Sequence, residues 1–280
     1  MNEDMRDYWN ADAGNSWAEM QTRMDLALTP VTAALFDLAR PAPGEWVLDI
    51  GCGTGETGLL LAAAVGEDGD VLGVDISRPM LKIANQRAEA LDSHVDFLEA
   101  DAAILPGSAG RDLLVSRFGV MFFDDPIAAF TNLLGHAKPG GRLCFACWQA
   151  PQDNGWATLS TAAVAELLPP GAPADPLAPG PFAFADPVRL RLILEQAGWA
   201  DVSLIPHGFY MRIGGGEDPV ADAVDFSLKI GPAARAAREG GPHVARQASA
   251  ALAGLYADHV VDGVVALPAA IWLVSARRIE

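Results

Sequence analysis

The chain has 280 residues, of which 51% are hydrophobic and 20% are charged, and its formal net charge is −17 at pH 7. This composition predicts a globular chain with a sizeable core rather than a disordered one. The acidic balance argues against nucleic acid as a partner, because phosphate binding needs clustered lysine and arginine. The chain begins MNEDMRDYWN, with no basic segment leading into an apolar one, and the longest apolar run, 59–65, is too short to span a bilayer. We therefore expect a cytoplasmic protein without stable membrane insertion.

The cysteines do not predict a metal or redox centre. Three cysteines, Cys52, Cys144 and Cys147, are too few for a disulfide framework, which fits a reducing compartment. Cys144 and Cys147 form a C-x-x-C within an expected strand, where an offset of three places them on opposite faces. Two packed thiols are the better interpretation, and we expect no bound metal.

The first forty residues predict helices that precede the main fold. Four large side chains, Trp9, Trp17, Met20 and Met24, recur at spacings that bring them together on helical segments. Two interpretations stay open at this stage. The segment is either an amphipathic element that packs on the core or a lid that covers a ligand, with Trp17 a candidate ligand contact.

Residues 46–148 alternate between short strands and helices. We expect strands over 46–50, 71–76, 95–100, 112–119 and 142–148. Helices are expected over 56–65 and 78–91, the second with Ser77 at its N-cap position, and from Pro126 onward. Asp124 and Asp125 precede this proline and suggest a helix cap more than a metal site. Such alternation predicts βαβ units around a parallel sheet that is buried on both faces.

The chain changes character after residue 150. A short helix over 156–168 leads into a loop rich in proline, glycine and alanine over 168–187. A helix over 187–199 that stops at Gly198 comes next, followed by a strand over 200–213, a largely helical stretch over 217–259 and a last strand over 264–279. Pro206 and Pro268 within these two strands indicate sheet edges or bends.

The stretch VLDIGCGTG, residues 47–55, predicts the main binding site. Gly53, Gly55 and Gly58 satisfy the dinucleotide pattern G-x-G-x-x-G, at the junction of a strand and a helix. Asp49, however, stands two residues ahead of Gly51. A buried carboxylate at that place repels a pyrophosphate and attracts an ammonium group. S-adenosylmethionine (SAM) carries an ammonium and a sulfonium and has no phosphate, so it is the ligand that the residues favour.

Carboxylates also follow the next two strands. Asp75 ends the second strand and could accept hydrogen bonds from ribose hydroxyls, and Asp101 follows the third, where an adenine amine could lie. All three acids then meet at the carboxyl edge of the sheet, where open α/β folds bind ligands. Each could instead be a helix cap or turn residue.

Taken together, these motifs resemble those of the class I SAM-dependent methyltransferases. VLDIGCGTG matches the first motif of that family in full, Asp75 and Asp101 follow its second and third motifs, and AKPGGRL follows the approach to its fifth strand. Within the class, the pattern is most similar to small-molecule methyltransferases of the ubiquinone and menaquinone biosynthesis type. The resemblance implies an α/β fold: a Rossmann-like, seven-stranded, mostly parallel doubly wound sheet. Its last strand, here 264–278, would be antiparallel.

The resemblance also implies how one methyltransferase domain over 1–280 is organised. The expected segments are an N-terminal helical lid (1–40), a SAM-binding core (41–150), a loop, helix and sixth strand (151–213), a helical cap insertion (214–262) and the last strand (263–280). A monomer and a homodimer both stay open, since an apolar cap helix and a dimer interface look alike in a sequence.

The family likeness assigns roles to individual residues. The methionine part of SAM would lie against Asp49, Gly51, Cys52, Gly53 and Gly55. The ribose would meet Asp75, flanked by Ile76 and Met80, and the adenine would lie by Asp101 and Ala102. The residues that would face the transferred methyl are Ser116, Arg117 and Phe118. Arg117 could bind the SAM carboxylate or an anionic substrate, with a surface salt bridge as the alternative.

The expected reaction is an in-line methyl transfer to a small, apolar or aromatic metabolite through oxygen or carbon. The protein then has mainly to align the acceptor and exclude water. A general base for an oxygen acceptor would come from His207, Tyr210, His243 or His259, although a lone histidine is more often structural. Candidate pocket aromatics are Trp9, Trp17, Phe118, Trp148, Trp156, Phe209, Tyr210 and Phe226. Alternatives from other classes are a SAM-binding regulatory protein and an enzyme that uses SAM for another reaction, such as decarboxylation.

Overall fold

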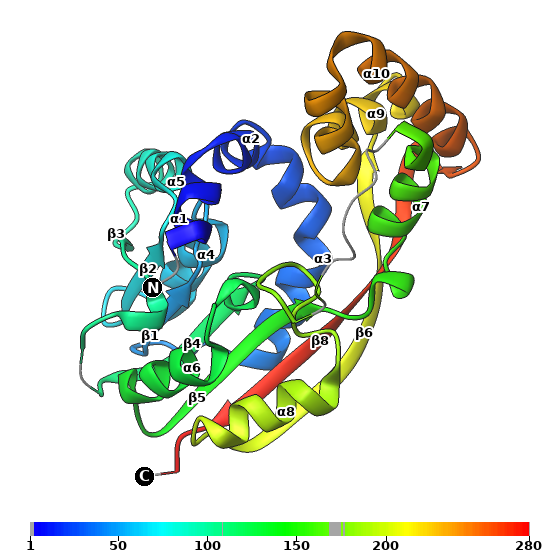
Figure 1. Cartoon of the computed structure of the whole chain (residues 1–280). Coiled ribbons are helices and arrows are strands. Elements are labelled where there is room, and N and C mark those ends of the chain that lie inside the picture. The colour runs from blue at the N-terminus through cyan, green and yellow to red at the C-terminus, as the bar shows by residue number, and fades with distance from the viewer. Residues whose placement is uncertain (1–2, 108, 168–174, 176, 280) are drawn as a thin grey trace.

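One sheet forms the centre of the structure, a computed structural model that describes residues 3–107, 109–167, 175 and 177–279 (Figure 1). Within these residues the sheet has eight strands in the order β3-β2-β1-β4-β5-β8-β6, and the short β7 pairs with β8. The strands are β1 (Trp46–Ile50), β2 (Asp70–Asp75), β3 (Asp96–Glu99), β4 (Arg111–Arg117), β5 (Ala137–Trp148), β6 (Ala200–Gly214), β7 (Val260–Val261) and β8 (Val264–Arg277).

Strand direction follows the predicted pattern. Strands β1 to β5 pair in parallel, whereas β8 runs antiparallel to both β5 and β6. The prediction of a Rossmann-like, mostly parallel sheet with an antiparallel last strand is therefore confirmed. The sequence did not reveal β7, because two residues carry no period-2 signal.

Helices fill the connections between the strands. They are α1 (Glu3–Asn10), α2 (Asp12–Glu19), α3 (Gln21–Ala39), α4 (Glu56–Val65), α5 (Arg78–Ala90), α6 (Pro126–His136), α7 (Gly155–Ala163), α8 (Pro187–Gln196), α9 (Pro219–Lys229) and α10 (Pro232–Ala257). Three of them begin with proline after a capping aspartate, because the side chains of Asp125, Asp186 and Asp218 each accept a hydrogen bond from a first-turn N–H. The expected cap at Asp125 is thus confirmed.

Ser77 differs from the expectation in its contacts. It occupies the N-cap position of α5, but its side chain makes no cap hydrogen bond. Its hydroxyl instead donates to the backbone oxygen of Trp9 at 2.7 Å. The backbone of α1 thus engages the hydroxyl that would otherwise cap α5. Only the tertiary structure brings Trp9 close to Ser77.

Two long strands carry the second half of the chain away from the main sheet. In Figure 1, β6 and β8 extend beyond the other strands, and α7, α9 and α10 gather around their far end. The stretch predicted as a helical insertion, 214–262, contains α9, α10 and β7. A buried polar cluster joins α7, α9 and α10. The Tyr256 hydroxyl of α10 lies 3.0 Å from the Ser160 hydroxyl of α7 and 2.6 Å from the Ser227 hydroxyl of α9.

Several smaller predictions can be compared with the structure. Strand β6 ends the strand order, so the expectation that Pro206 marks a sheet edge is confirmed. Cys144 and Cys147 are buried and free, and burial raises the pKa of the Cys144 thiol to about 11. Of the loop predicted over 168–187, residues 168–174 and 176 lie outside the described part of the structure, and 177–186 form turns. In the part of the chain that the structure describes, none of the helices has the length and apolar character that crossing a membrane requires.

The loop after β1 is fixed by a close approach of two backbones. Gly51 has φ +66° and its N–H donates to the Val74 carbonyl at 2.8 Å, which holds the loop over the end of β2. A Cβ added at Gly51 would lie 2.6 Å from the Cα of Gly119, in the segment after β4. Only glycine allows both the left-handed backbone and this contact. The two loops that border the site are therefore positioned by direct backbone packing.

Replacement of Gly51 by alanine should destabilise the fold more than an alanine at another left-handed glycine. Gly44 is the matched control, with φ +80° and no heavy atom within 4 Å of an added Cβ. Gly44→Ala should cost about 1–2 kcal/mol from the backbone conformation alone. Gly51→Ala should cost about 1–3 kcal/mol beyond that, because the backbone of Gly119 must move. Urea denaturation of both variants measures this, and equal losses would contradict the steric explanation.

Candidate functional site

A cavity of about 410 Å³ opens at the carboxyl ends of β1, β2, β3 and β4. Most of the predicted cofactor residues line it: Trp17, Gly51, Cys52, Gly53, Asp75, Ile76, Met80, Asp101, Ala102, Arg117 and Phe118. They come from five separate stretches of the chain, which the parallel sheet brings to one edge. Asp49, Gly55 and Ser116 do not line the cavity and have supporting positions instead.

Gly53 leaves room at the cavity wall. Its φ is +55°, and the nearest atoms to an added Cβ are the sulfur and methyl of Met80, at 3.8 and 3.9 Å. Both residues line the cavity. The space that a side chain would fill is therefore open to a ligand that approaches the backbone, as a glycine loop at a helix N-terminus allows.

Asp75 has a structural role in addition to its exposure to the cavity. Its Oδ2 accepts from the N–H of Gly53 and its Oδ1 from the N–H of Ser77, both at 2.8 Å. Burial raises the pKa of this carboxyl, and the two N–H donors oppose that rise. The lone pairs that these two bonds leave can accept hydrogen bonds from hydroxyls in the cavity. Asp101 is similar, since its Oδ1 accepts from Ala103 N–H at 2.9 Å, as the helix-cap alternative predicted.

Asp49 lies beneath the glycine loop rather than at its mouth. It is fully buried, and its Oδ2 accepts a hydrogen bond from the Thr57 hydroxyl at 2.5 Å. Its Oδ1 accepts no hydrogen bond. Burial raises the pKa of the Asp49 carboxyl to about 6. Asp49 therefore acts on the cavity through its electric field, and a ligand with a positive group next to the loop would stabilise its ionised form.

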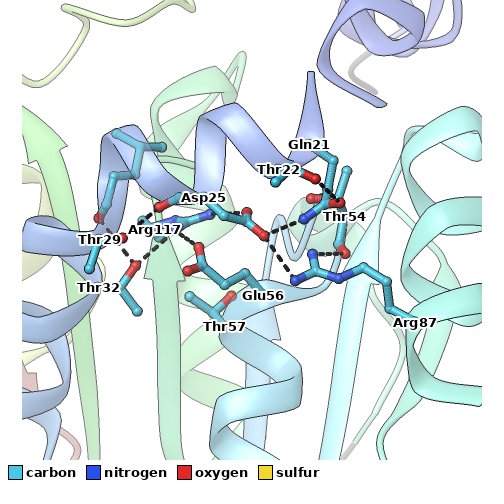
Figure 2. Close-up of polar contacts among 12 residues, drawn as sticks. Gln21, Thr22, Asp25, Thr29, Thr32, Thr54, Glu56, Thr57, Arg87 and Arg117 are labelled. Atoms are coloured by element: carbon cyan, nitrogen blue, oxygen red, sulfur yellow. Dashed lines mark hydrogen bonds and ion pairs between the residues drawn. The ribbon is translucent and has the colours of Figure 1, made fainter. Parts of the chain in front are cut away.

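The segment after β4 has a different arrangement from the one expected. The Ser116 hydroxyl is buried and donates to the Ile50 carbonyl at 2.7 Å, so it joins β4 to β1. Arg117 lines the cavity but forms an ion pair with Glu56 and donates to the Thr32 hydroxyl at 2.8 Å (Figure 2). The side chains of Arg117 and Glu56 are only 12% and 14% exposed, so this pair is not the surface salt bridge of the alternative interpretation.

Aromatic rings also line the cavity. Phe118, at φ +69°, stacks on Trp148 with ring centroids 4.3 Å apart and planes 10° apart. Trp156 lies 5.0 Å from Trp148, and Trp9 and Trp17 meet edge to face at 5.9 Å. These five rings were all predicted to line a pocket, and they do. Flat apolar walls of this kind suit a planar or apolar ligand.

Three other predicted pocket aromatics do not line the cavity, and the prediction is wrong for them. Phe209 stacks behind Trp148 at 6.2 Å, Tyr210 is 71% exposed on β6, and Phe226 is buried beneath the Arg23 guanidinium. Sequence reasoning in turn missed the following lining residues: Met5, Tyr8, Asp25, Met121, Phe122, Phe123, Met211 and Ile230. They come from helices and strand ends, and the packing of these elements decides which side chains face the cavity. The spacing of the residues in the sequence does not reveal this.

None of the candidate general bases reaches the cavity. His207 and Tyr210 lie on β6, His243 is exposed on α10, and the His259 Nδ1 lies 2.8 Å from the Leu255 carbonyl. The described titratable residues that line the cavity are Tyr8, Asp25, Cys52, Asp75, Asp101 and Arg117. The geometry therefore gives the four predicted residues no direct part in the chemistry of the cavity.

The fold, the glycine loop and the three carboxylates agree with the resemblance to SAM-dependent methyltransferases. Residues 47–141 match the family described as methyltransferase domain. The chain is 32% identical over 126 residues to an O-methyltransferase of Pyrenophora dematioidea, and this match covers 44% of the chain and 46% of that protein. It is 34% identical over 134 residues to a demethylmenaquinone methyltransferase of Thermus thermophilus, over 48% of the chain and 60% of that protein.

The fold is shared with solved structures. The phosphoethanolamine N-methyltransferase 2 of Haemonchus contortus, solved with S-adenosyl-L-methionine, superposes with a TM-score of 0.58 at 15% identity, over 98% of this chain and 60% of that one. The chain spans about half the length of the curated relatives it matches. Residues 47–141, which match a methyltransferase domain, are the part of the chain that contains the glycine loop.

Binding of S-adenosylhomocysteine should weaken as the pH falls through 6. The Asp49 carboxyl is ionised above its pKa of about 6 and neutral below it, so its field on a ligand ammonium is present at pH 7.5 and lost at pH 5. We expect the affinity to fall about three- to tenfold between these values. Calorimetric titration measures this. Asp49→Asn should flatten that part of the profile, and an unchanged slope in the variant would assign the titration to another group.

Proposed function

We propose that the chain transfers a methyl group from SAM to a small, apolar or aromatic acceptor, at oxygen or carbon, by in-line displacement. One observation carries the proposal: a single cavity is lined both by carboxylates and glycine backbone and by aromatic rings. The first group suits an adenosyl amino acid and the second a flat acceptor. The names of the relatives, an O-methyltransferase and a demethylmenaquinone methyltransferase, support the same class of reaction.

The fit of SAM rests on the residues themselves. Asp75 offers carboxylate oxygens to the ribose hydroxyls, and Asp101 and Ala102 lie where the adenine would end. Gly53 leaves its backbone bare for the amino acid part. SAM bound there would supply a methyl carbon already activated by its positive sulfur.

The chain's own contribution is alignment and exclusion of water. Phe118, Trp148 and Trp156 line the cavity with packed rings that would confine a planar acceptor to one orientation. The N-terminal helices contribute Trp9 and Trp17 to the cavity lining. They act as a lid in this proposal, and they are bound to the core by specific contacts.

Asn10 provides two of those contacts. Its Nδ2 donates to the Ile76 carbonyl at 2.8 Å, and its Oδ1 accepts from the Arg78 N–H at 3.0 Å. The side chain thus bridges the backbone where β2 passes into α5, directly beside the expected ribose site. A lid held at this point limits the access of water to the adenosyl group, which favours displacement over side reactions.

Parallel titration with SAM, S-adenosylhomocysteine and NAD is the first test. Binding of both adenosyl ligands without NAD is the expected result, because the acids around the loop disfavour a pyrophosphate. Incubation with SAM and a panel of hydroxylated aromatic compounds should then yield S-adenosylhomocysteine and a product heavier by one methyl group. Binding without turnover across the panel would favour a regulatory SAM-binding protein, and a product lacking the added methyl would favour another reaction. Binding of NAD alone would overturn the proposal.

Truncation of Trp156 separates the acceptor side from the cofactor side. Trp156→Ala removes a ring that lines the cavity and packs on Trp148, while the glycine loop is untouched. We expect the KM for an aromatic acceptor to rise about tenfold or more, since a buried aromatic contact contributes of the order of 1–3 kcal/mol. The affinity for S-adenosylhomocysteine should stay within about twofold. A loss confined to cofactor binding would contradict the assignment of this wall to the acceptor.

A further inference from the structure

The polar end of the cavity includes a carboxylate that the family motif does not contain. We use "polar end" for the lining residues Asp25, Thr54, Thr57 and Arg117. Asp25 lies on α3, ahead of the family-matched residues 47–141. Nothing in its local sequence distinguishes it from an ordinary helix-surface acid. The fold nevertheless turns it inward, so that it faces the cavity beside the glycine loop.

The contacts of Asp25 leave one oxygen free. Its Oδ2 accepts from Gln21 Nε2 at 2.5 Å and from Arg87 Nη2 at 2.8 Å. Arg87 also donates to the Thr54 carbonyl at 2.8 Å, so it connects α3 to the glycine loop. Figure 2 shows Asp25 between Arg87 on one side and Arg117 on the other. The carboxylate is therefore held in place through one oxygen.

The other oxygen, Oδ1, is buried and accepts no hydrogen bond. Arg117 Nη2 lies 4.0 Å from it, which is beyond hydrogen-bond distance. The Asp25 carboxylate also neighbours the Glu56 carboxyl, whose pKa burial raises and Asp25 raises further. Among the described residues, the buried side-chain oxygens in this condition are Asp25 Oδ1 and Asp49 Oδ1. A buried carboxylate oxygen without a donor is costly, and it marks a place where a ligand donor would be stabilised.

The charges around this oxygen favour a cation. Three carboxylates, Asp25, Asp49 and Glu56, share two guanidinium groups, Arg87 and Arg117. Arg117 is already engaged by Glu56 and by the Thr32 hydroxyl, which leaves it little capacity to attract a ligand anion. With all five side chains ionised, this group around the polar end carries one negative charge in excess. An ammonium group would balance it, whereas a phosphate would be repelled.

We propose that Asp25 Oδ1 accepts a hydrogen bond from the α-ammonium of the bound adenosyl amino acid and sets the specificity for ligands that carry this group. The assignment rests on the proposed function. Asp49 is buried beneath the loop and does not line the cavity, so it acts on the ammonium through its electric field. Asp25 lines the cavity and supplies the direct hydrogen bond. Arg87 is a positioning residue, because it fixes the Asp25 carboxylate and the loop together.

Three ligands distinguish loss of the hydrogen bond between Asp25 and the ammonium from a general disturbance of the binding site. S-adenosylhomocysteine carries the ammonium, its deaminated analogue lacks only that group, and 5′-methylthioadenosine lacks the whole amino acid part. Asp25→Asn keeps an oxygen for Gln21 and Arg87 but places an NH2 donor where the ammonium needs an acceptor. The affinity for S-adenosylhomocysteine should fall about 10- to 100-fold, the effect of removing a charge-assisted hydrogen bond. Affinities for the other two ligands should change by less than about twofold.

Asp37→Asn is the matched control, since Asp37 is an exposed acid on the same helix. It should leave the affinities for all three ligands unchanged, and the thermal unfolding of both variants reports on folding. Equal losses for all three ligands in Asp25→Asn would make Asp25 a purely structural residue and overturn the proposal. Unchanged binding of S-adenosylhomocysteine in the folded variant would overturn it too. If the wild-type protein binds none of the three, the proposed function itself fails and this assignment falls with it.

Discussion

Two hydrogen bonds to one buried carboxylate hold the site together. Asp75 accepts from Gly53 in the glycine loop and from Ser77 at the start of α5, and in this way it ties the turns after β1 and β2 to each other. The Ser77 hydroxyl then donates to the Trp9 carbonyl and extends the connection to the N-terminal helices. The glycine loop, the start of α5 and the N-terminal helices are thus connected through Asp75 and Ser77. Hydrogen bonds in a low-dielectric setting rigidify the elements they join.

The cofactor side of the cavity is therefore built from charges that the protein alone does not fully compensate. Burial raises the pKa of Asp49, Glu56 and Asp75, which means that the fold disfavours their ionised forms. Such an arrangement costs stability in the free protein, and a positively charged ligand would offset part of that cost. Functional sites commonly contain carboxyls in this condition, whereas a purely structural network is expected to satisfy its own oxygens.

The aromatic part of the cavity lining follows the opposite principle. Trp148 lies at the end of β5 and contacts Phe118, Trp156 and Phe209, rings that come from three other parts of the chain. These contacts are apolar and tolerate rearrangement better than a charged network does. Phe118 lies within the family-matched residues 47–141, whereas Trp148 at the end of β5 and Trp156 on α7 lie outside them. This division is how a common cofactor fold can accommodate different acceptors.

The sequence by itself determined the alternation of strands and helices, the glycine loop with its acids, and the class of protein, because these depend on local spacing: apolar periods, Asp-Pro helix starts and glycines at positive φ. It also identified Asp75, Asp101 and five of the pocket aromatics, which lie at or near strand and helix ends that a parallel sheet must bring together. Tertiary structure alone decided that Asp49 lies beneath the loop, that Arg117 is bound by Glu56, and that Asp25 faces the cavity. Burial and pairing of a charge depend on residues far apart in the chain, and Asp25 is 62 positions from Arg87. No local pattern records such a distance, so these contacts become visible only once the chain is folded.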